Sequence, residues 1–321
     1  MTTWTGVRLA VAGVGHLGRH HARVAASLAG VHVVGVYDHH PGRAEEVARE
    51  FSLPILTDLE AVVREAEAVV VATPTLTHAE IAGFCLDRGL HVLVEKPITL
   101  RVSEADDLLA RARRARRVLQ VGHVERYNPA IEAALGLVSS PRFIEVHRLG
   151  VFTARSLDVD VVLDLMIHDL QIVSCLVGRP VREVRAAGVP VLTTKLDIAN
   201  ARLAFEGGCV ANLTASRVSA DKVRKCRVFA PSIYVSVDMQ AQSVKAYRLA
   251  SDSGRPEIHP VAVSVSREEP LARELADFRR AIVDGARPLV SGEDGRDALV
   301  LAERVLDAVE EHRATLEEAP V

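Results

Sequence analysis

A glycine-rich turn near the start of the chain is the feature that most constrains how the chain can fold. Gly13, Gly15 and Gly18 follow a short apolar run in the spacing G-x-G-x-x-G. In this spacing the first glycine allows a tight turn, the second lets a pyrophosphate approach the backbone, and the third lets the next helix pack against the strand. A helical pattern begins at His16 and Leu17, so free N–H groups would face the phosphates there. The turn predicts a dinucleotide site, against the alternative of a glycine turn in some other α/β domain.

An acidic residue at the end of the second apolar run indicates which dinucleotide is bound. Asp38 follows the run 31–37 and lies 20 residues after Gly18, where a carboxylate can bond the adenosine ribose hydroxyls. The same carboxylate would repel a 2′-phosphate, and the nearest arginine after it is Arg43. The sequence therefore predicts NAD, not NADP, as the cofactor.

Composition and charge exclude several classes of protein. The formal net charge of -3 gives no electrostatic reason to bind nucleic acid or an anionic membrane. No apolar run approaches the length of a membrane span, and no export signal is visible, so we expect a cytoplasmic protein. The four cysteines lack C-x-x-C spacing and lie among apolar residues, which predicts buried thiols and no metal site.

The order of apolar segments predicts two domains. Strands and helices alternate over 7–122, which is typical of a doubly wound parallel sheet of the Rossmann type. The later sequence is rich in alternating strands, which predicts an α+β domain with an open, mainly antiparallel sheet. We place an NAD-binding domain at 1–125 and a substrate-binding and dimerisation domain at 126–321. The closing amphipathic helices 271–284 and 296–312 are expected to pack back on the first domain.

Polar residues follow two of the predicted parallel strands. Thr73 and Pro74 come directly after one strand, and Glu95 and Lys96 come after the next. Ligands bind beyond the carboxyl ends of parallel strands, so these residues are expected to lie against the cofactor. A lysine beside the nicotinamide can bind a substrate hydroxyl and help to remove its proton. His78, one turn into the intervening helix, fits either the same crevice or the surface.

A nearly continuous apolar helix at 161–177 carries a narrow polar stripe. Asp164, His168 and Gln171 fall at positions i, i+4 and i+7 of this helix. A carboxylate one turn before an imidazole can orient it and support its protonated form, as a general acid or base requires. The alternative is a core histidine with ordinary hydrogen bonds. Asp169 points about 100° away from His168 and is predicted to be structural.

These motifs together resemble one family of oxidoreductases. The glycine turn, Thr73-Pro74, Glu95-Lys96-Pro97 and Asp164 with His168 are similar to the motifs of the glucose-fructose oxidoreductase / inositol dehydrogenase (Gfo/Idh/MocA) family. The resemblance covers the whole chain. It implies that Lys96, Asp164 and His168 are a catalytic group that acts on a sugar or cyclitol hydroxyl. It also implies an open sheet that forms a homodimer or homotetramer.

Within this family, residues 121–129 and 162–169 are similar to members that oxidise the 3-hydroxyl of a UDP-amino sugar such as UDP-N-acetylglucosamine. Those members make a 3-keto sugar nucleotide, which an aminotransferase converts to a 3-amino sugar for lipid A. The substrate-binding residues expected on this basis are Glu125, Arg126 and Tyr127 near the sugar, and Arg217, Lys222 and Arg224 near the diphosphate. The last three are otherwise exposed charges at the end of a hairpin. A free-sugar or myo-inositol dehydrogenase and a non-catalytic NAD-binding sensor remain the alternatives.

Overall fold

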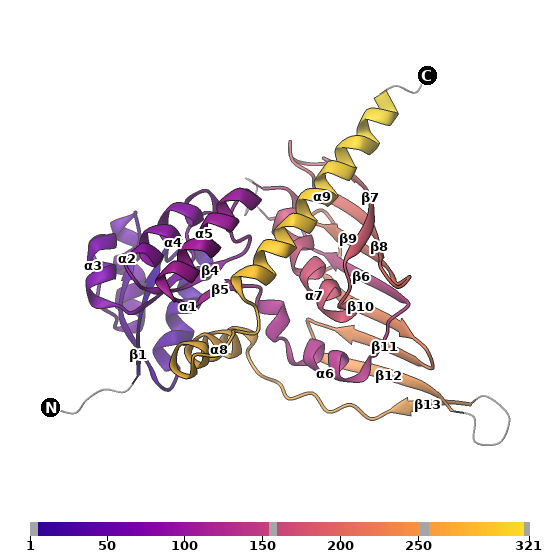
Figure 1. The fold of residues 1–321 in the computed structure, drawn as a ribbon, viewed down its shortest axis with the longest axis horizontal. Coiled ribbons are helices and arrows are strands. Elements are labelled where there is room, and N and C mark those ends of the chain that lie inside the picture. Colours follow the sequence, from indigo (N-terminus) through magenta and orange to yellow (C-terminus); the bar gives the residue numbers. More distant parts are fainter. Residues whose placement is uncertain (1–5, 154–158, 251–256, 318–321) are drawn as a thin grey trace. The chain divides into compact units, whose positions relative to one another are not determined.

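The computed structural model describes residues 6–153, 159–250 and 257–317 (Figure 1). The chain forms two compact units. The first unit holds the residues up to Val124 together with Glu269–Leu299. The second holds Glu125–Glu268 together with the residues from Val300 onward. The division predicted from the sequence placed the boundary between residues 125 and 126.

The first unit is built on a parallel sheet of five strands, in the order β2-β1-β3-β4-β5. The strands are β1 (Val7–Ala12), β2 (Val31–Tyr37), β3 (Ala68–Val71), β4 (His91–Glu95) and β5 (Leu119–Gly122). The central strand β3 is buried along its whole length. A parallel sheet covered on both faces favours such valine-rich strands, because β-branched side chains pack well on a pleated surface. The doubly wound fold predicted from the alternation is confirmed.

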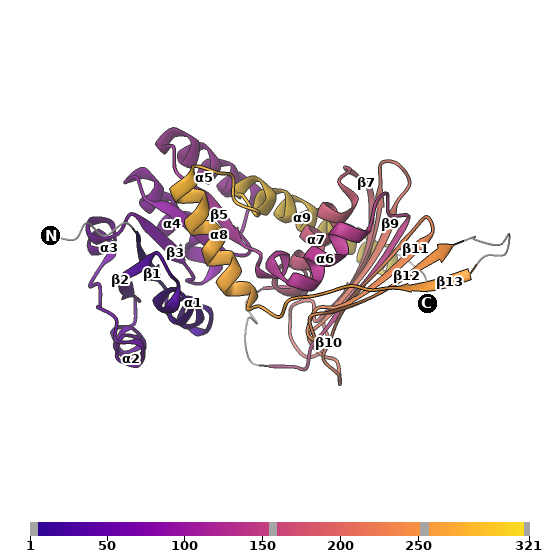
Figure 2. The ribbon, with the colours of Figure 1, turned by 90° about the horizontal axis from the view of Figure 1, so that it is seen from below.

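Helices cover both faces of this sheet. Figure 2 shows α1 and α2 on one side and α4 and α5 on the other. The helices of the unit are α1 (His16–Ser27), α2 (Pro41–Phe51), α3 (Leu59–Glu65), α4 (His78–Asp87), α5 (Val102–Ala115) and α8 (Pro270–Asp284). Helix α8 contacts α1 and β1, and its Leu275 and Phe278 lie in the same hydrophobic core as the first strands. A segment from near the end of the chain thus completes the core of the first unit.

The second unit is built on an eight-stranded sheet, in the order β13-β12-β11-β10-β6-β9-β8-β7. The strands are β6 (Phe143–Leu149), β7 (Val181–Val189), β8 (Ile198–Phe205), β9 (Val210–Ser216), β10 (Val223–Ala230), β11 (Ile233–Asp238), β12 (Ser243–Ala250) and β13 (Glu257–Val261). Strands β6 and β9 pair in parallel, and the other pairs are antiparallel. The prediction of a mainly antiparallel sheet is confirmed.

One face of the second sheet carries helices. Figure 2 shows α6 (Pro129–Leu137) and α7 (Ile167–Val177) on the same face, and α6 contacts β11 and β12. The long helix α9 (Gly292–Glu317) begins in the residues of the first unit and ends in those of the second. No helix in the described ranges is long and apolar enough to cross a membrane.

The prediction that all four cysteines are buried is wrong for one of them. Cys85, Cys209 and Cys226 are buried, but Cys175 is exposed. Cys175 lies near the end of α7, which is followed by Gly178 in a left-handed conformation. The next residue, Leu176, is still buried, so Cys175 lies on the solvent-exposed side of a helix whose other side packs in the core.

Candidate active site

The glycine turn between β1 and α1 has the shape that a dinucleotide needs. Gly13 has a φ of +84°, and a Cβ there would meet the backbone nitrogen of Thr73 at 2.7 Å. A Cβ on Gly18 would meet the carbonyl oxygen of Gly13 at 1.7 Å. A Cβ on Gly15 would meet nothing within 4 Å. The first and third glycines are therefore required by packing, whereas Gly15 leaves open space where a pyrophosphate would approach.

The beginning of α1 presents a favourable site for an anion. Its N-cap is Gly15, no side chain caps the helix, and no acidic residue occupies the first turn, which includes His16 and Leu17. N–H groups at a helix start carry a partial positive charge. At the end of β2, the Asp38 carboxylate accepts the N–H of Val14 at 2.8 Å and so lies beside the same turn. These features fit the phosphates and the adenosine ribose of NAD.

His78 is the residue for which the sequence left two positions open, the crevice at the strand ends or the surface. It is buried, and its ring nitrogens lie 2.9 Å from the carbonyl oxygens of Pro97 and Thr73. Burial lowers the pKa of this histidine. The alternative of a surface position is wrong, whereas a contact of His78 with the cofactor stays a prediction. His78 instead joins the loop that follows β3, with Thr73 and Pro74, to the loop that follows β4.

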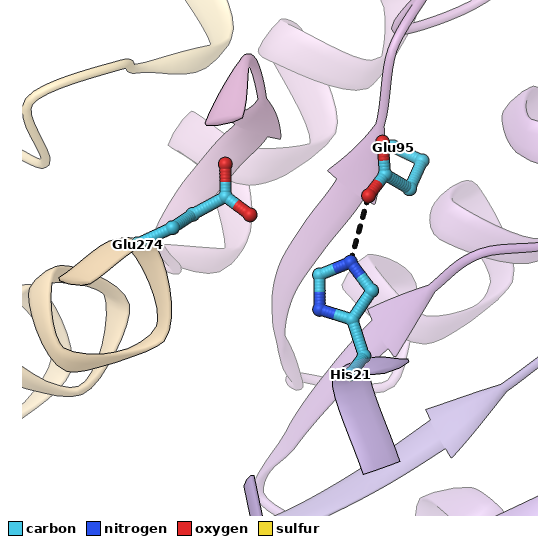
Figure 3. Close-up of side chains that lie close together, drawn as sticks. All are labelled: His21, Glu95 and Glu274. Carbon is cyan, nitrogen blue, oxygen red and sulfur yellow. Dashed lines mark hydrogen bonds and ion pairs between the residues drawn. The ribbon is translucent and has the colours of Figure 1, made fainter. Parts of the chain in front are cut away.

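Glu95 and Lys96 follow β4, but their side chains have different surroundings. The Glu95 carboxylate is buried, lies 2.7 Å from Nε2 of His21 on α1 and accepts the N–H of Lys96 at 3.2 Å (Figure 3). Burial raises the pKa of Glu95, but the His21 hydrogen bond and the charges of His21 and Lys96 outweigh it and lower the pKa. The Glu95 side chain therefore points into the protein, and its contact with the cofactor stays a prediction. Lys96 precedes Pro97 through a cis peptide bond.

His123 is a residue of this region that the sequence reasoning missed. It comes directly after β5 and is buried. Burial and the charge of Lys96 lower the pKa of His123 to about 3, so its imidazole is neutral at physiological pH. The rule that placed residues at the ends of β3 and β4 also applies to β5 and would have found this histidine.

The segment that carries Asp164 and His168 is not one continuous α-helix. Residues Val162–Met166 form a π-helical turn, and the α-helix α7 begins at Ile167. The prediction of a single helix is wrong here, because hydrophobic periodicity does not distinguish a wide turn from an ordinary one. Asp164 is half-buried in the wide turn, whereas His168 is buried in the first turn of α7. Such turns occur frequently at functional sites.

A buried network of charges lies beside this helix in the second unit. Arg148 on β6 donates two hydrogen bonds to Asp169, at 2.8 and 2.7 Å, and a third to Glu125 at 2.9 Å. Arg224 on β10 donates to the same oxygen of Glu125 at 3.0 Å. Burial opposes the charge of Arg148, but Asp169 and Glu125 raise its pKa above the usual range. The structural role predicted for Asp169 agrees with these contacts.

The residues predicted to bind the substrate separate into two groups. Glu125 and Tyr127 are buried, and the Glu125 carboxylate accepts from Arg148 and Arg224 at Oε1 and from Asn128 at Oε2. Arg217 is buried, with Nη2 donating to the carbonyl of Val159 at 2.8 Å. These contacts hold both side chains within the second unit, and the roles of Glu125 near a sugar and of Arg217 near a diphosphate stay predictions. Lys222 and Arg224 line a cavity of about 330 Å³ together with Lys225. Arg126 is half-buried.

Taken unit by unit, the fold and the site define an NAD-dependent oxidoreductase. The family model described as an oxidoreductase family with an NAD-binding Rossmann fold matches residues 7–123, and the model of the GFO/IDH/MocA C-terminal domain matches residues 138–231. The chain belongs to the Gfo/Idh/MocA oxidoreductase family, whose dehydrogenases act on CH–OH groups with NAD.

Relatives at two levels of similarity are informative. The chain is 39% identical over 310 residues to UDP-N-acetylglucosamine 3-dehydrogenase of Acidithiobacillus ferrooxidans, which covers 95% of this chain and 97% of that protein. A solved structure of that enzyme superposes with a TM-score of 0.88 and covers 95% of this chain and 98% of its own. The scyllo-inositol 2-dehydrogenase (NAD(+)) of Bacillus subtilis is 30% identical over 232 residues, which are 66% of this chain and 68% of that protein.

Proposed function

We propose that the protein oxidises the 3-hydroxyl of UDP-N-acetylglucosamine to the 3-keto sugar nucleotide with NAD. The observation that carries this proposal is the 39% identity to a 3-dehydrogenase of that substrate over 95% of the chain. Inositol dehydrogenases provide a second candidate function, since one of them is 30% identical over two thirds of the chain. A non-catalytic NAD-binding sensor is disfavoured because Lys96, Asp164 and His168 are all present.

The first unit would hold NAD, which accepts a hydride from the substrate carbon when it is bound. The open space at Gly15 and the uncapped start of α1 would receive the pyrophosphate. Asp38 would bond the ribose hydroxyls, since its carboxylate is fixed beside the turn by the N–H of Val14. Thr73 and Pro74 would line the same side of the sheet, at the end of β3.

Three residues would act on the substrate hydroxyl. Lys96 would hold and polarise the oxygen, and His168, oriented by Asp164, would take the proton. The burial of His168 suits this role, because it limits exchange of the imidazole proton with water. Either Lys96 or His168 would be the immediate base, and we assign the removal of the proton to the pair.

The second unit would bind the sugar nucleotide. Lys222 and Arg224, which share one cavity, would contact the diphosphate, because charge-assisted hydrogen bonds from lysine and arginine are strong. Arg126 would contact the sugar, while Glu125 would hold Arg224 in place. The keto product would be a substrate for an aminotransferase that makes a 3-amino sugar for lipid A. The open face of the eight-stranded sheet would form the homodimer or homotetramer.

A substrate panel tests this proposal. Purified protein would be incubated with NAD and, in separate reactions, with UDP-N-acetylglucosamine, N-acetylglucosamine and myo-inositol, while absorbance of the reduced cofactor is followed. We expect oxidation of the UDP-sugar alone. Robust oxidation of a free polyol without oxidation of the UDP-sugar would favour the inositol dehydrogenase alternative.

Variants assign the roles of the residues. Lys96→Met and His168→Ala should each lower kcat by about 10²–10⁴-fold, with NAD binding retained.

Lys222→Ala should raise the KM for UDP-N-acetylglucosamine more than it lowers kcat, because it removes binding that is uniform between ground and transition states. The exposed Lys245 on β12 provides a matched control, and Lys245→Ala should leave both constants unchanged.

A further inference from the structure

Three ionisable side chains from distant parts of the sequence meet in the interior of the first unit. His21 comes from α1, Glu95 from the end of β4 and Glu274 from α8 (Figure 3). All three are buried, with relative exposures of 0%, 6% and 0%. One nitrogen or oxygen atom from each lies within 4.8 Å of those of the other two. None of the three has been given a catalytic role above.

This cluster contains more hydrogen-bonding capacity than the described residues satisfy. His21 Nε2 contacts Glu95 at 2.7 Å, but Nδ1 of His21 and both carboxylate oxygens of Glu274 have no partner among the residues that the structure describes. Figure 3 shows the Glu274 carboxylate directed toward the His21–Glu95 pair. A buried ionised carboxylate without a donor is strongly unfavourable, so Glu274 must be neutral or must share a hydrogen.

The charges that face Glu274 favour the neutral form. Glu95 on β4 and Asp277 on α8 are both acidic. On β5, the Gln120 amide donates to the main-chain carbonyl of Glu274 at 3.1 Å and leaves the carboxylate unpaired. Burial, and then the charges of Glu95 and Asp277, raise the pKa of Glu274 well above its usual range. The pKa of Glu95 is lowered, so the pKa values of the two acids lie on opposite sides of the usual value. A proton in this cluster is therefore on Glu274.

We propose that Glu274 is a positioning residue, a neutral carboxylic acid whose proton completes the His21–Glu95 pair and fixes the carboxylate that holds the main chain of Lys96. The structural link is the N–H of Lys96, which donates to the second carboxylate oxygen of Glu95. The consequence for catalysis rests on the role proposed above for Lys96. Through His21, the same cluster also contacts the helix that begins at the glycine turn.

A cluster held by hydrogen bonds explains the geometry of His21, Glu95 and Glu274 better than a bound metal ion does. Two ligand atoms that each lie about 2.0–2.2 Å from a metal are separated by roughly 3 Å or more at ordinary coordination angles. The His21–Glu95 contact of 2.7 Å is shorter than this and is typical of a strong hydrogen bond. A bound metal ion would nevertheless give a different experimental result, which is described below.

The first measurement is the pH dependence of thermal stability, which needs no substrate. Glu274 has a raised pKa in the folded state, so the stability it contributes is present below the unfolded pKa of about 4.3 and is lost as pH rises toward the folded pKa. The Tm of the wild type relative to Glu274→Gln should therefore fall steadily between about pH 5 and about pH 8. The exposed Asp284, also on α8, is the matched control, and Asp284→Asn should show no such trend.

The second measurement compares two substitutions by activity. Glu274→Leu removes the hydrogen-bonding group and should lower kcat by about 10–100-fold, because displacement of a reacting group by about 1 Å can cost about 100-fold. Glu274→Gln keeps a neutral group of the same shape and should restore most of this loss. The KM for NAD should change little in either variant. A flat Tm difference across pH would show that Glu274 is ionised in the folded protein, and would overturn the proposal.

Two further results would overturn the proposal for Glu274 without refuting the proposed function of the protein. If Zn²⁺ or Mn²⁺ raised the Tm of the wild type but not of Glu274→Gln, the cluster would be a metal site and the shared proton would be wrong. If the Tm trend appeared but Glu274→Leu kept full activity, the proton assignment would stand and the positioning role would be overturned. Absence of activity in the wild type on every substrate would refute the proposed function and leave the Tm result unaffected.

Discussion

Each compact unit buries a cluster of charged groups, and the two clusters are neutralised in different ways. In the second unit, Arg148 binds Asp169 and Glu125 through three hydrogen bonds and Arg224 binds Glu125, so two positive and two negative charges balance. In the first unit, Glu95 and Glu274 lie close to a single histidine, and the proton that we assign to Glu274 removes the charge of the second acid. The arginines of the second unit keep their charge at any ordinary pH, although burial raises the pKa of Asp169, whereas the first unit depends on a proton held by a carboxylate and so responds to pH directly.

The origin of the ion-pair network is visible in the sheet register. Arg224 on β10 pairs with Arg148 on β6, so two guanidinium groups are neighbours on adjacent strands. Like charges at such positions are unfavourable, and the single oxygen of Glu125 that accepts from both relieves the repulsion. The Asp169 carboxylate then secures α7, the helix that carries His168, to the sheet.

The largest effect is expected when the ion-pair network is broken. Arg148→Met should lower the free energy of unfolding by about 3–5 kcal/mol, because it leaves the buried Asp169 carboxylate without its cation and leaves Glu125 with Arg224 alone. Urea unfolding followed by circular dichroism measures the change. A loss of under about 1 kcal/mol would mean that the buried carboxylates of the second unit take up protons as easily as those of the first. The contrast between the two clusters would then disappear.

A neighbouring ion pair on the same two strands provides the control for that variant. Arg227 on β10 contacts Glu145 on β6 at 2.8 Å, but both side chains are partly exposed, at 41% and 31%. Exposed pairs contribute about 0–1 kcal/mol. Arg227→Met should therefore cost far less than Arg148→Met, although both remove an arginine from β10 or β6.

An intermediate effect is expected in the first unit. His21→Leu removes the hydrogen bond to Glu95 and should cost about 1–3 kcal/mol at neutral pH, less than Arg148→Met, because Glu95 can take up a proton. Glu95 has a lowered pKa in the wild type, so its contribution is present above the unfolded pKa and is lost as pH falls through the folded pKa. The difference in Tm between wild type and His21→Leu should therefore shrink as pH falls below about 4.3. A difference that grows in acid would contradict this assignment.

The elements that the sequence predicted correctly are those specified by local pattern. The glycine turn and the valine-rich run of β3 indicate a parallel sheet from a few neighbouring residues alone. The same strand-end rule located Lys96. It did not reveal that the neighbouring Glu95 turns inward, since the direction of a side chain at a strand end depends on its partner, and His21 lies on another element.

What the sequence did not reveal depends on tertiary contacts. Glu274 follows Glu95 by 179 residues, and no spacing rule connects an acid on α8 to one after β4. The π-helical turn at Val162–Met166 has the same apolar composition as an α-helix. Glu125 and Arg217 are charged residues in polar segments, which favours exposure, yet hydrogen bonds within the second unit bury them.

The smallest effect concerns a third means of neutralising a buried carboxylate, without an ion pair or a bound proton. Asp197 accepts the N–H groups of Val191, Leu192 and Thr193 at 2.6 to 2.8 Å. Burial raises the pKa of Asp197, but these hydrogen bonds and that of the Thr193 hydroxyl outweigh it and lower the pKa to about 2. Asp197→Asn keeps an acceptor oxygen but loses the charge, and it should cost about 1 kcal/mol at neutral pH.

This variant sharpens the comparison through its pH profile. A lowered pKa contributes stability above the unfolded value of about 3.9, and this contribution is lost as pH falls through the folded value of about 2. The Tm difference between wild type and Asp197→Asn should therefore be constant from neutral pH down to about pH 4 and then decline. The Tm difference for Glu274→Gln should instead change above about pH 4. Thermal unfolding of both variants across the same buffers would show the two trends. If the Asp197→Asn difference drifted between about pH 5 and about pH 8, the main-chain N–H groups would not be what fixes the charge of this carboxylate.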